Sequence, residues 1–240
     1  MKIKITLSYD GTHYNGSQIQ PSVPTIQSEL LKTLKIINID STLDFSGRTD
    51  KGVHAFKQVV SCTVPSFWKD TRNLKIALNR LLPNALLIRD IKEVEEEFHA
   101  RFSAIKREYR YLLSAKKLTP FNANYISYYE TINEKKINEA IQLFIGIHDF
   151  EYFRKKASDP ISTVREIYSI HFYKHQDIFV LHFKANSYLR SQIRMIVDFI
   201  MKISSGKLSL EDLHQQLNVK KLISWTLAPA SGLYLSKIHY

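Results

Sequence analysis

The spacing of apolar residues changes repeatedly along the chain, and these changes predict where its strands and helices lie. Alternation of polar and apolar residues over positions 2–9 predicts a strand. Ile26, Leu30 and Leu34 then recur at helical spacing after Thr25, a favourable helix N-cap, so a helix is expected next. The rest of this half predicts strands near 43–45 and 56–64, a helix over 71–82 that stops before Pro83, and a strand over 85–94.

The second half repeats the same order of elements. It predicts a strand at 107–114, a helix at 134–145, strands at 161–173 and 178–185, a helix at 187–203, an extra helix at 209–217 and a strand at 232–239. Two β-α-β-β-α-β halves give an α+β fold with antiparallel sheets and helices packed on one face. We expect an N-terminal domain over 1–104, a C-terminal domain over 105–240, and an active-site cleft between the halves.

Composition and charge indicate which class of partner the protein binds. With 44% hydrophobic residues the chain can build a core, and 34 Lys+Arg against 23 Asp+Glu give a net charge of +11. Such a charge attracts polyanions, and nucleic acid is the first candidate. An acidic membrane surface is the alternative, but the sequence has neither a basic amphipathic helix nor a lipid anchor, so we expect no membrane association.

Two further features favour a cytoplasmic protein. The first residues alternate in polarity and lack the continuous apolar region of a signal peptide. Cys62 is the only cysteine, which excludes an intrachain disulfide and a thiolate metal cluster. A reducing compartment is therefore expected.

One loop combines residues that can carry chemistry. Residues 46–55 read SGRTDKGVHA, in which Gly47 and Gly52 enclose one carboxylate, Asp50, and two cations, Arg48 and Lys51. In a purely structural interpretation, the aspartate caps a turn and pairs with a neighbouring cation. In a functional one, an ionised carboxylate is presented as a nucleophile. The loop is neither a phosphate-binding Walker loop nor a dinucleotide fingerprint.

The same loop resembles the signature Gly-Arg-Thr-Asp-x-Gly-Val-His-Ala of the tRNA pseudouridine synthase A family, in which the aspartate is the essential catalytic residue. The resemblance continues in family order through nearly the whole chain. Its further segments are residues 9–16, 98–111, 146–150, 165–167, 186–194 and 228–235.

The resemblance implies isomerisation of uridine to pseudouridine at nucleotides 38, 39 and 40 of the tRNA anticodon stem-loop, on a flipped-out nucleotide. This reaction breaks the bond between ribose and base nitrogen, turns the uracil and rejoins it through carbon 5. It consumes no energy source, so no cofactor and no metal are expected. The carboxylate of Asp50 can attack the anomeric carbon or carbon 6 of the uracil, or assist departure of the base. A homodimer acting on tRNA is also implied.

The resemblance assigns Tyr109 as the tyrosine that packs on the target uracil. In the predicted strand at 107–114, Tyr109 shares one face with Arg107 and Tyr111. Aromatic residues also fill such faces without any function, and for Tyr111 we keep that structural interpretation.

Three arginines complete the implied substrate-binding set. By resemblance, Arg194 pairs with the catalytic carboxylate, while Arg48 neutralises phosphate and orients the loop. Arg190 lies four residues before Arg194 on the predicted helix at 187–203, so both are expected along one edge of its apolar stripe. Asp198 offers an alternative, because it lies four residues beyond Arg194 and can hold it in an ordinary surface pair.

Basic and aromatic residues alternate in two short stretches, 101–117 and 153–156. This composition is typical of surfaces on which phosphates and bases are bound. It also occurs on ordinary solvated faces.

The sequence departs from the family pattern at two places. Ser17 stands where many members carry tryptophan, and Arg190-Ser191 replaces a usual pair of histidines. Asp50, Tyr109 and Arg194 are all retained, which argues against an inactive relative. A tRNA-binding or chaperone protein that retains the site without using it is the second hypothesis. A third, an aspartate-nucleophile phosphohydrolase, lacks the carboxylate cluster that would hold magnesium.

Overall fold

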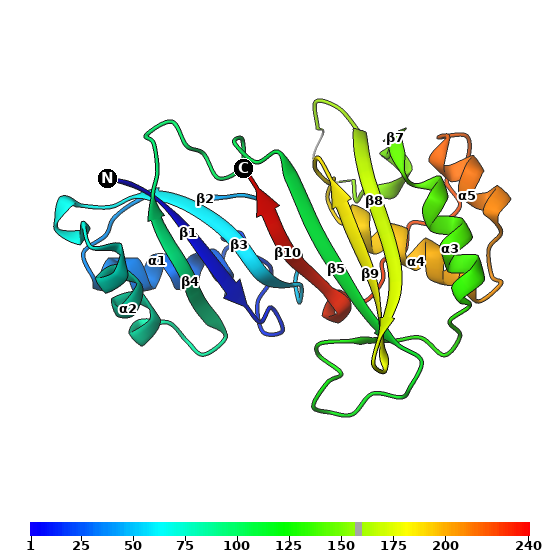
Figure 1. Cartoon of the computed structure of the whole chain (residues 1–240), viewed down its shortest axis with the longest axis horizontal. Coiled ribbons are helices and arrows are strands. Elements are labelled where there is room, and N and C mark those ends of the chain that lie inside the picture. The colour runs from blue at the N-terminus through cyan, green and yellow to red at the C-terminus, as the bar shows by residue number, and fades with distance from the viewer. Residues whose placement is uncertain (157–159) are drawn as a thin grey trace. The chain divides into compact units, whose positions relative to one another are not determined.

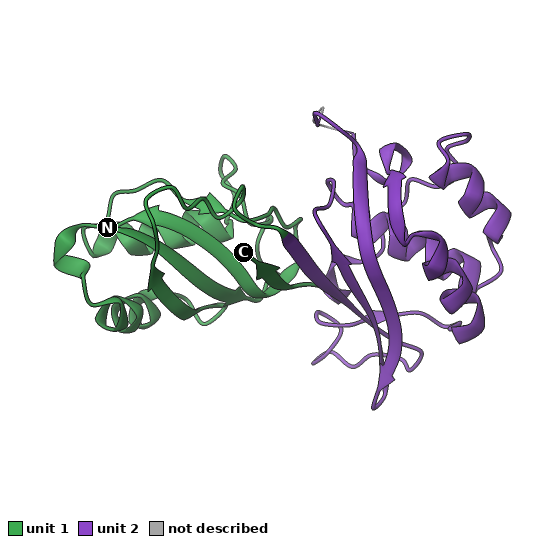
Figure 2. Cartoon of the chain, turned by 45° about the horizontal axis from the view of Figure 1, so that its top comes forward, with its two compact units in different colours: residues 1–105, 234–240 green, residues 106–233 purple. Residues whose placement is uncertain are grey.

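The computed structural model describes residues 1–156 and 160–240 (Figure 1). It divides into two compact units, residues 1–105 with 234–240 and residues 106–233 (Figure 2). The order of elements in the sequence predicts the last strand, β10 (Leu233–His239), as part of the second half. From Tyr234 onward its residues belong to the first unit, because Tyr234 and Leu235 pair in parallel with His54 and Ala55.

Unit 1 contains the first predicted repeat. Its elements are β1 (Lys2–Tyr9), α1 (Ile26–Ile36), β2 (Asp44–Phe45), β3 (His54–Thr63), the short η1 (Ser66–Trp68), α2 (Thr71–Leu81) and β4 (Leu86–Glu93). The strand order is β4-β1-β3, with the short β2 on the other side of β3, and these pairs are antiparallel. This order is that of a split β-α-β arrangement, as expected from the order of elements.

The core of unit 1 lies on one face of this sheet. Along β1, Ile3, Ile5 and Leu7 are fully buried, while the residues between them are partly exposed. Leu30 of α1 and Leu74 of α2 are fully buried too, and the two helices contact each other. Both helices therefore cover the same face, and the predicted one-sided packing is confirmed.

Unit 2 contains β5 (Lys106–Ser114), β6 (Ser127–Tyr128), α3 (Glu134–Leu143), β7 (Gly146–Asp149), η2 (Glu151–Phe153), β8 (Val164–His175), β9 (Ile178–Ala185), α4 (Gln192–Ser204), α5 (Leu210–Leu217) and η3 (Ala230–Gly232). The order β5-β9-β8-β7 is antiparallel throughout, and β6 joins β5 in parallel. The run β5-β9-β8 corresponds to β1-β3-β2 of unit 1, which confirms two similar α+β halves. Figure 1 shows α3, α4 and α5 grouped beside these strands.

The prediction that a helix begins at residue 187 was wrong. The helix α4 begins at Gln192, and the residue before it, Ser191, has a left-handed φ of 58°. The side-chain oxygen of Gln192 reaches back and accepts a hydrogen bond from the backbone N–H of Leu189 at 2.7 Å. These two features keep the preceding residues out of the helix, although their apolar spacing continues that of α4.

No helix in the described part of the chain is long and apolar enough to cross a membrane.

The predicted N-cap of α1 is confirmed and carries a measurable energy. The Thr25 hydroxyl accepts a hydrogen bond from Ser28 N–H at 3.1 Å, and the Ser28 hydroxyl accepts one from Thr25 N–H at 3.0 Å. We expect Thr25→Ala to lower the free energy of unfolding by about 1 kcal/mol. Thr25→Ser keeps the hydroxyl, so we expect it to retain most of the free energy of unfolding, measured by the same denaturant titration. Equal stability of the alanine variant and the wild type would contradict this role of the cap.

Candidate active site

The loop that carries Asp50 connects β2 to β3 in unit 1. Along it, Ser46, Thr49 and Val53 are buried, Arg48 is exposed and Asp50 is partly exposed. The buried residues lie on both sides of the carboxylate, so they fix the loop to the unit beneath it. The charged residues between them are left at the surface, where a ligand can reach them.

Thr49, the residue immediately before Asp50, is held by its side chain and by both of its backbone groups. Its hydroxyl is 2.9 Å from the Tyr9 hydroxyl. Its N–H donates to Ser17 Oγ at 2.9 Å, and its carbonyl accepts from Ser17 N–H at 3.1 Å. Ser17 is fully buried, and burial raises the pKa of Tyr9 to about 12, so this phenol keeps its proton even well above neutral pH. The position of the backbone next to Asp50 is thereby fixed.

Gln58, fully buried on β3, anchors the beginning of the loop. Its amide nitrogen donates to the Gly47 carbonyl at 3.0 Å, and its amide oxygen accepts from the Ser46 hydroxyl at 2.6 Å. Its amide nitrogen also lies 3.4 Å from the Tyr9 hydroxyl. A buried glutamine is costly unless its amide is satisfied. Both the nitrogen and the oxygen of this amide have hydrogen-bond partners here. The contacts of Gln58 and those of Thr49 both include the Tyr9 hydroxyl.

The N-terminal segment packs directly against the backbone of this loop. Gly16 has a φ of 95°, and a Cβ there would lie 2.6 Å from the Thr49 carbonyl oxygen. A Cβ at Gly11 would lie 2.1 Å from the Val53 carbonyl oxygen. Glycine is required at both positions because the two backbones approach so closely.

His54 ends the loop in a structural role. It is 2% exposed, and its Nδ1 accepts a hydrogen bond from Gly11 N–H at 3.1 Å. Asp10 Oδ1 is 3.2 Å from the same nitrogen, which cannot also donate to it while accepting from Gly11. The ring stacks on Tyr234 at 4.7 Å. His54 therefore serves hydrogen bonding between this loop and the N-terminal segment.

In unit 2, Tyr109 and Tyr111 differ in their surroundings. Tyr109 on β5 is 7% exposed and meets the ring of Tyr188 edge-on, with centroids 5.3 Å apart at 84°. Tyr111 is fully buried, and its hydroxyl is 2.8 Å from Ser127 Oγ and 3.0 Å from the Pro229 carbonyl oxygen. The structural interpretation of Tyr111 is confirmed, since both its ring and its hydroxyl are engaged within the unit.

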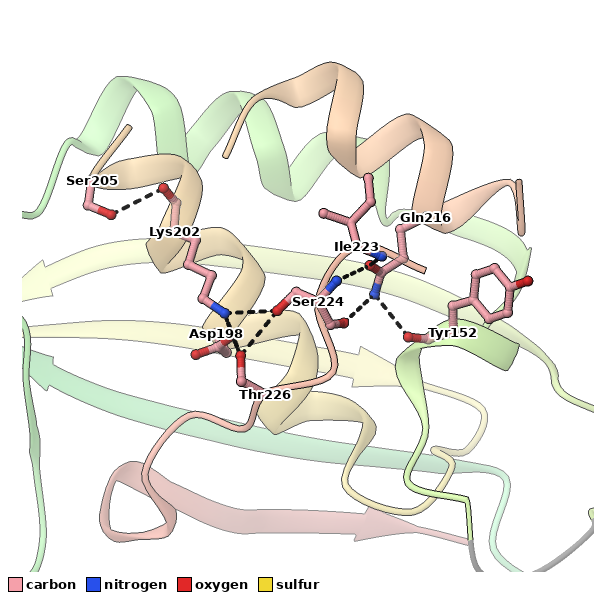
Figure 3. Close-up of polar contacts among 8 residues, drawn as sticks. All are labelled: Tyr152, Asp198, Lys202, Ser205, Gln216, Ile223, Ser224 and Thr226. Carbon is pink, nitrogen blue, oxygen red and sulfur yellow. Dashed lines mark hydrogen bonds and ion pairs between the residues drawn. The ribbon is translucent and has the colours of Figure 1, made fainter. Parts of the chain in front are cut away.

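Arg194 lies on the first turn of α4 and is held by the chain that crosses it. Its Nε donates to the Ala228 carbonyl at 2.8 Å, and Ala228 N–H donates to the Arg194 carbonyl at 3.0 Å. Asp198 pairs with Lys202 Nζ at 2.8 Å (Figure 3). The alternative of a surface pair between Arg194 and Asp198 was therefore wrong.

The predicted alignment of Arg190 with Arg194 was wrong as well. Arg190 precedes α4, and the left-handed Ser191 separates it from the helix, so the four-residue spacing does not place the two arginines on one helix face. Arg190 is exposed, and its carbonyl accepts from Lys155 N–H at 3.0 Å. In the second basic stretch, Arg154 is paired with Glu151 at 2.6 Å.

Sequence reasoning missed the residues that hold the loop. Gln58 gave one signal, because it is a polar residue at a buried position of a predicted strand. In the sequence, Ser17 is only a departure from the family pattern, whereas in the structure it accepts a hydrogen bond from Thr49 N–H. No spacing in the sequence connects positions 9, 17, 49 and 58, because these contacts depend on the tertiary fold.

Comparison with known proteins decides the family. The family model described as tRNA pseudouridine synthase matches residues 5–103 and 140–240. The chain belongs to the tRNA pseudouridine synthase family. This enzyme is therefore an isomerase, and the resemblance found in its sequence is confirmed.

Relatives of this family member match it from end to end. A protein of Campylobacter jejuni (strain RM1221), named tRNA pseudouridine synthase A, is 39% identical over 240 residues and covers 100% of both chains. One of Wolinella succinogenes with the same name is 40% identical over 234 residues, covering 98% of this chain and 92% of its own. One of Geobacillus sp. (strain WCH70), also so named, is 36% identical over 249 residues, covering 100% and 98%.

The anchor at Thr49 can be tested in this family member through Ser17. Ser17→Ala removes the acceptor of the buried Thr49 N–H, which is expected to lower the free energy of unfolding by about 1 to 3 kcal/mol. Ser205→Ala, at an exposed position, is the matched control and is expected to cost little. Equal loss in the two variants, measured by denaturant titration, would show that Ser17 does not anchor the loop.

A substitution at Tyr188 of this enzyme is expected to raise the free energy of unfolding, whereas Ser17→Ala lowers it. Among the described residues its hydroxyl has no hydrogen-bond partner, and burial raises the pKa of this phenol well above its usual range. Tyr188→Phe removes an unsatisfied buried group and keeps the ring that meets Tyr109. We expect the free energy of unfolding to rise by about 1 kcal/mol, measured by thermal denaturation. A clear loss of stability would rule out an unsatisfied hydroxyl.

Proposed function

We propose that this enzyme isomerises uridine to pseudouridine at positions 38, 39 and 40 of the tRNA anticodon stem-loop, with Asp50 as the reacting carboxylate. Membership of the family supports the reaction class. The observation that carries the assignment of Asp50 is its setting. It is a partly exposed carboxylate between two buried residues, Thr49, whose N–H donates to Ser17 Oγ, and Val53, whose N–H donates to the Asp50 carbonyl at 3.1 Å. Such a setting suits a group that must meet a substrate in a fixed geometry.

The reaction needs a carboxylate but no net proton or electron donor. The bond between the anomeric carbon and base nitrogen 1 breaks, the uracil turns, and a bond to carbon 5 forms. Carbon 5 then loses its proton and nitrogen 1 ends with one, so atoms and charge balance. Asp50 can serve by attack on the anomeric carbon, by attack on carbon 6, or by assisting departure of the base. Each route requires the same placement of the carboxylate beside the nucleoside.

We assign Tyr109 to stacking on the target uracil. A base stacked on an aromatic ring gains about 1 to 3 kcal/mol, which offsets much of the few kcal/mol needed to flip a nucleotide. The edge-on contact with Tyr188 supports this role, because it holds the Tyr109 ring in one orientation. A ring that is already oriented loses little further conformational freedom on binding.

We assign the arginines according to their surroundings. Arg194 is held at Nε by the Ala228 carbonyl, which fixes the plane of its guanidinium. Its charge is assigned to the carboxylate of Asp50. Arg48 and Arg190 are exposed, and we assign them to phosphates of the tRNA. Binding that depends on such contacts weakens as salt concentration rises.

We also propose that the enzyme acts in the cytoplasm as a homodimer. The cytoplasmic location rests on the single cysteine of the sequence, which is typical of a reducing compartment, and the homodimer on the family resemblance, in which a tRNA spans two subunits.

Replacement of the carboxylate by an amide tests this proposal. Asp50→Asn preserves size and the anchored loop, so tRNA binding is expected to persist, while turnover is expected to fall by at least about a thousandfold. Release of label from carbon 5 of uridine in tRNA measures turnover, and filter binding measures affinity. Lys51→Gln, the exposed neighbour, is the matched control.

The same variants separate the proposal from its rival. Appreciable turnover by Asp50→Asn would show that this carboxylate is not the reacting group. Normal rescue of a deletion strain by the inactive variant would favour a tRNA-binding or chaperone role in the cell. Loss of both turnover and rescue is the result that we expect.

A further inference from the structure

The chain between α5 and η3, residues 218–229, crosses α4 and ends at two carbonyl groups that matter for the proposed site. The Ala228 carbonyl accepts from Arg194 Nε, and the Pro229 carbonyl lies 3.0 Å from the Tyr111 hydroxyl. Burial raises the pKa of Tyr111 to about 12, so this phenol keeps its proton at neutral pH. This crossing segment has no regular secondary structure of its own, so its position depends on its side contacts.

The first set of contacts is made by Gln216, a fully buried residue of α5 (Figure 3). Its amide nitrogen donates to the carbonyls of Tyr152 at 2.9 Å and Ser224 at 2.8 Å. Its amide oxygen accepts from the N–H groups of Ile223 at 2.9 Å and Ser224 at 2.8 Å. Four hydrogen bonds satisfy this amide and fasten the crossing segment at residues 223 and 224.

The second set of contacts lies on α4, where Figure 3 shows Lys202, Asp198, Ser224 and Thr226 drawn together. Lys202 Nζ is 2.8 Å from Asp198 Oδ2 and donates to Ser224 Oγ at 2.8 Å. It also donates to the Thr226 hydroxyl, which in turn donates to Asp198 Oδ2 at 2.5 Å. The Thr226 hydroxyl thus accepts from the cation and donates to the carboxylate, and both of its hydrogen-bonding functions are used.

These contacts follow one side of α4. Arg194, Asp198 and Lys202 are spaced four residues apart, so they lie one above another on the helix. Thr226 binds at Asp198 and Lys202, and Ala228 binds one turn earlier at Arg194. Only Leu227 separates Thr226 from Ala228 in the chain, so a shift of Thr226 is passed directly to Ala228.

We propose that Thr226 is a positioning residue for the isomerisation, whose hydroxyl, held between Asp198 and Lys202, sets the place of Ala228 and thereby the orientation of the Arg194 guanidinium. This inference rests on the proposed role of Arg194. Thr226 does not touch the substrate in this account. It acts on the Arg194 side chain through the backbone carbonyl of Ala228.

The effect of Thr226 is expected on rate rather than on stability. Gln216 is fully buried and ties three segments together, so its replacement destabilises the unit whatever it does for Arg194. Thr226 is exposed, and loss of an exposed hydroxyl costs little folding energy. A small displacement of a charged group at a reaction centre, in contrast, lowers the rate by one or two orders of magnitude.

Thr226→Val keeps the shape of the side chain and removes its hydroxyl, whereas Thr226→Ser keeps the hydroxyl. In the full-length enzyme with tRNA, we expect Thr226→Val to lower the single-turnover rate by about tenfold to a hundredfold, with the dissociation constant for tRNA and the melting temperature nearly unchanged. Thr226→Ser is expected to restore most of the rate. Thr131→Val, at an exposed threonine outside this cluster, is the matched control.

Combination with Arg194→Lys shows whether Thr226 acts through the arginine. If it does, Thr226→Val slows the Arg194→Lys enzyme much less than it slows the wild type. Fully additive effects, an unchanged rate for Thr226→Val, or equal slowing by valine and serine would each overturn the inference. An Arg194→Lys enzyme of normal rate would overturn it together with the role proposed for Arg194. The role of Asp50 is judged separately by its amide variant.

Discussion

The hydrogen bonding of Thr49 is the constraint on which the candidate site depends. Its hydroxyl, N–H and carbonyl all bind buried partners, Tyr9 and Ser17, while the next side chain along the loop is left partly exposed. Buried polar groups that are fully satisfied specify one conformation, because any other conformation leaves at least one of them unpaired. The carboxylate is therefore presented by a loop that has little freedom to move, although it lies in a region rich in glycine and charge.

Unit 2 uses the same device for a different kind of residue. Arg194 is oriented by a carbonyl from a segment without regular structure, and that segment is held by the satisfied amide of Gln216 and by the cluster around Thr226 (Figure 3). In both units the residue proposed to meet the substrate is not itself the anchor. Thr49 holds the backbone beside Asp50, and the Ala228 carbonyl holds Arg194, so these groups define geometry without taking part in the reaction.

Much of the fold could be predicted because local signals agreed with it. The strand at 178–185 and the capped helix after Thr25 appear as expected, since alternation and capping act over a few residues. The start of α4 could not be predicted from spacing, because a left-handed serine and a glutamine side chain end the helix where apolar residues continue. The same misplaced boundary produced the wrong alignment of Arg190 with Arg194.

Only part of the candidate site could be predicted from the sequence. The motif around Asp50 was visible as a run of residues, but its anchors Tyr9, Ser17 and Gln58 lie as far as 40 residues in the chain from the loop residues that they bind. The same is true of Thr226, whose partners lie 24 and 28 residues before it. Only the folded structure brings such groups together, because short-range patterns do not record contacts between positions far apart in the chain.

The most direct test of this account is a crystal structure of the enzyme bound to an anticodon stem-loop RNA that carries 5-fluorouridine in place of the target uridine. The account predicts a flipped-out base in contact with the Tyr109 ring and with the carboxylate of Asp50, and a loop at 46–54 that keeps the hydrogen bonds of Thr49. A base bound far from Asp50, or a loop that rearranges to reach it, would contradict the account.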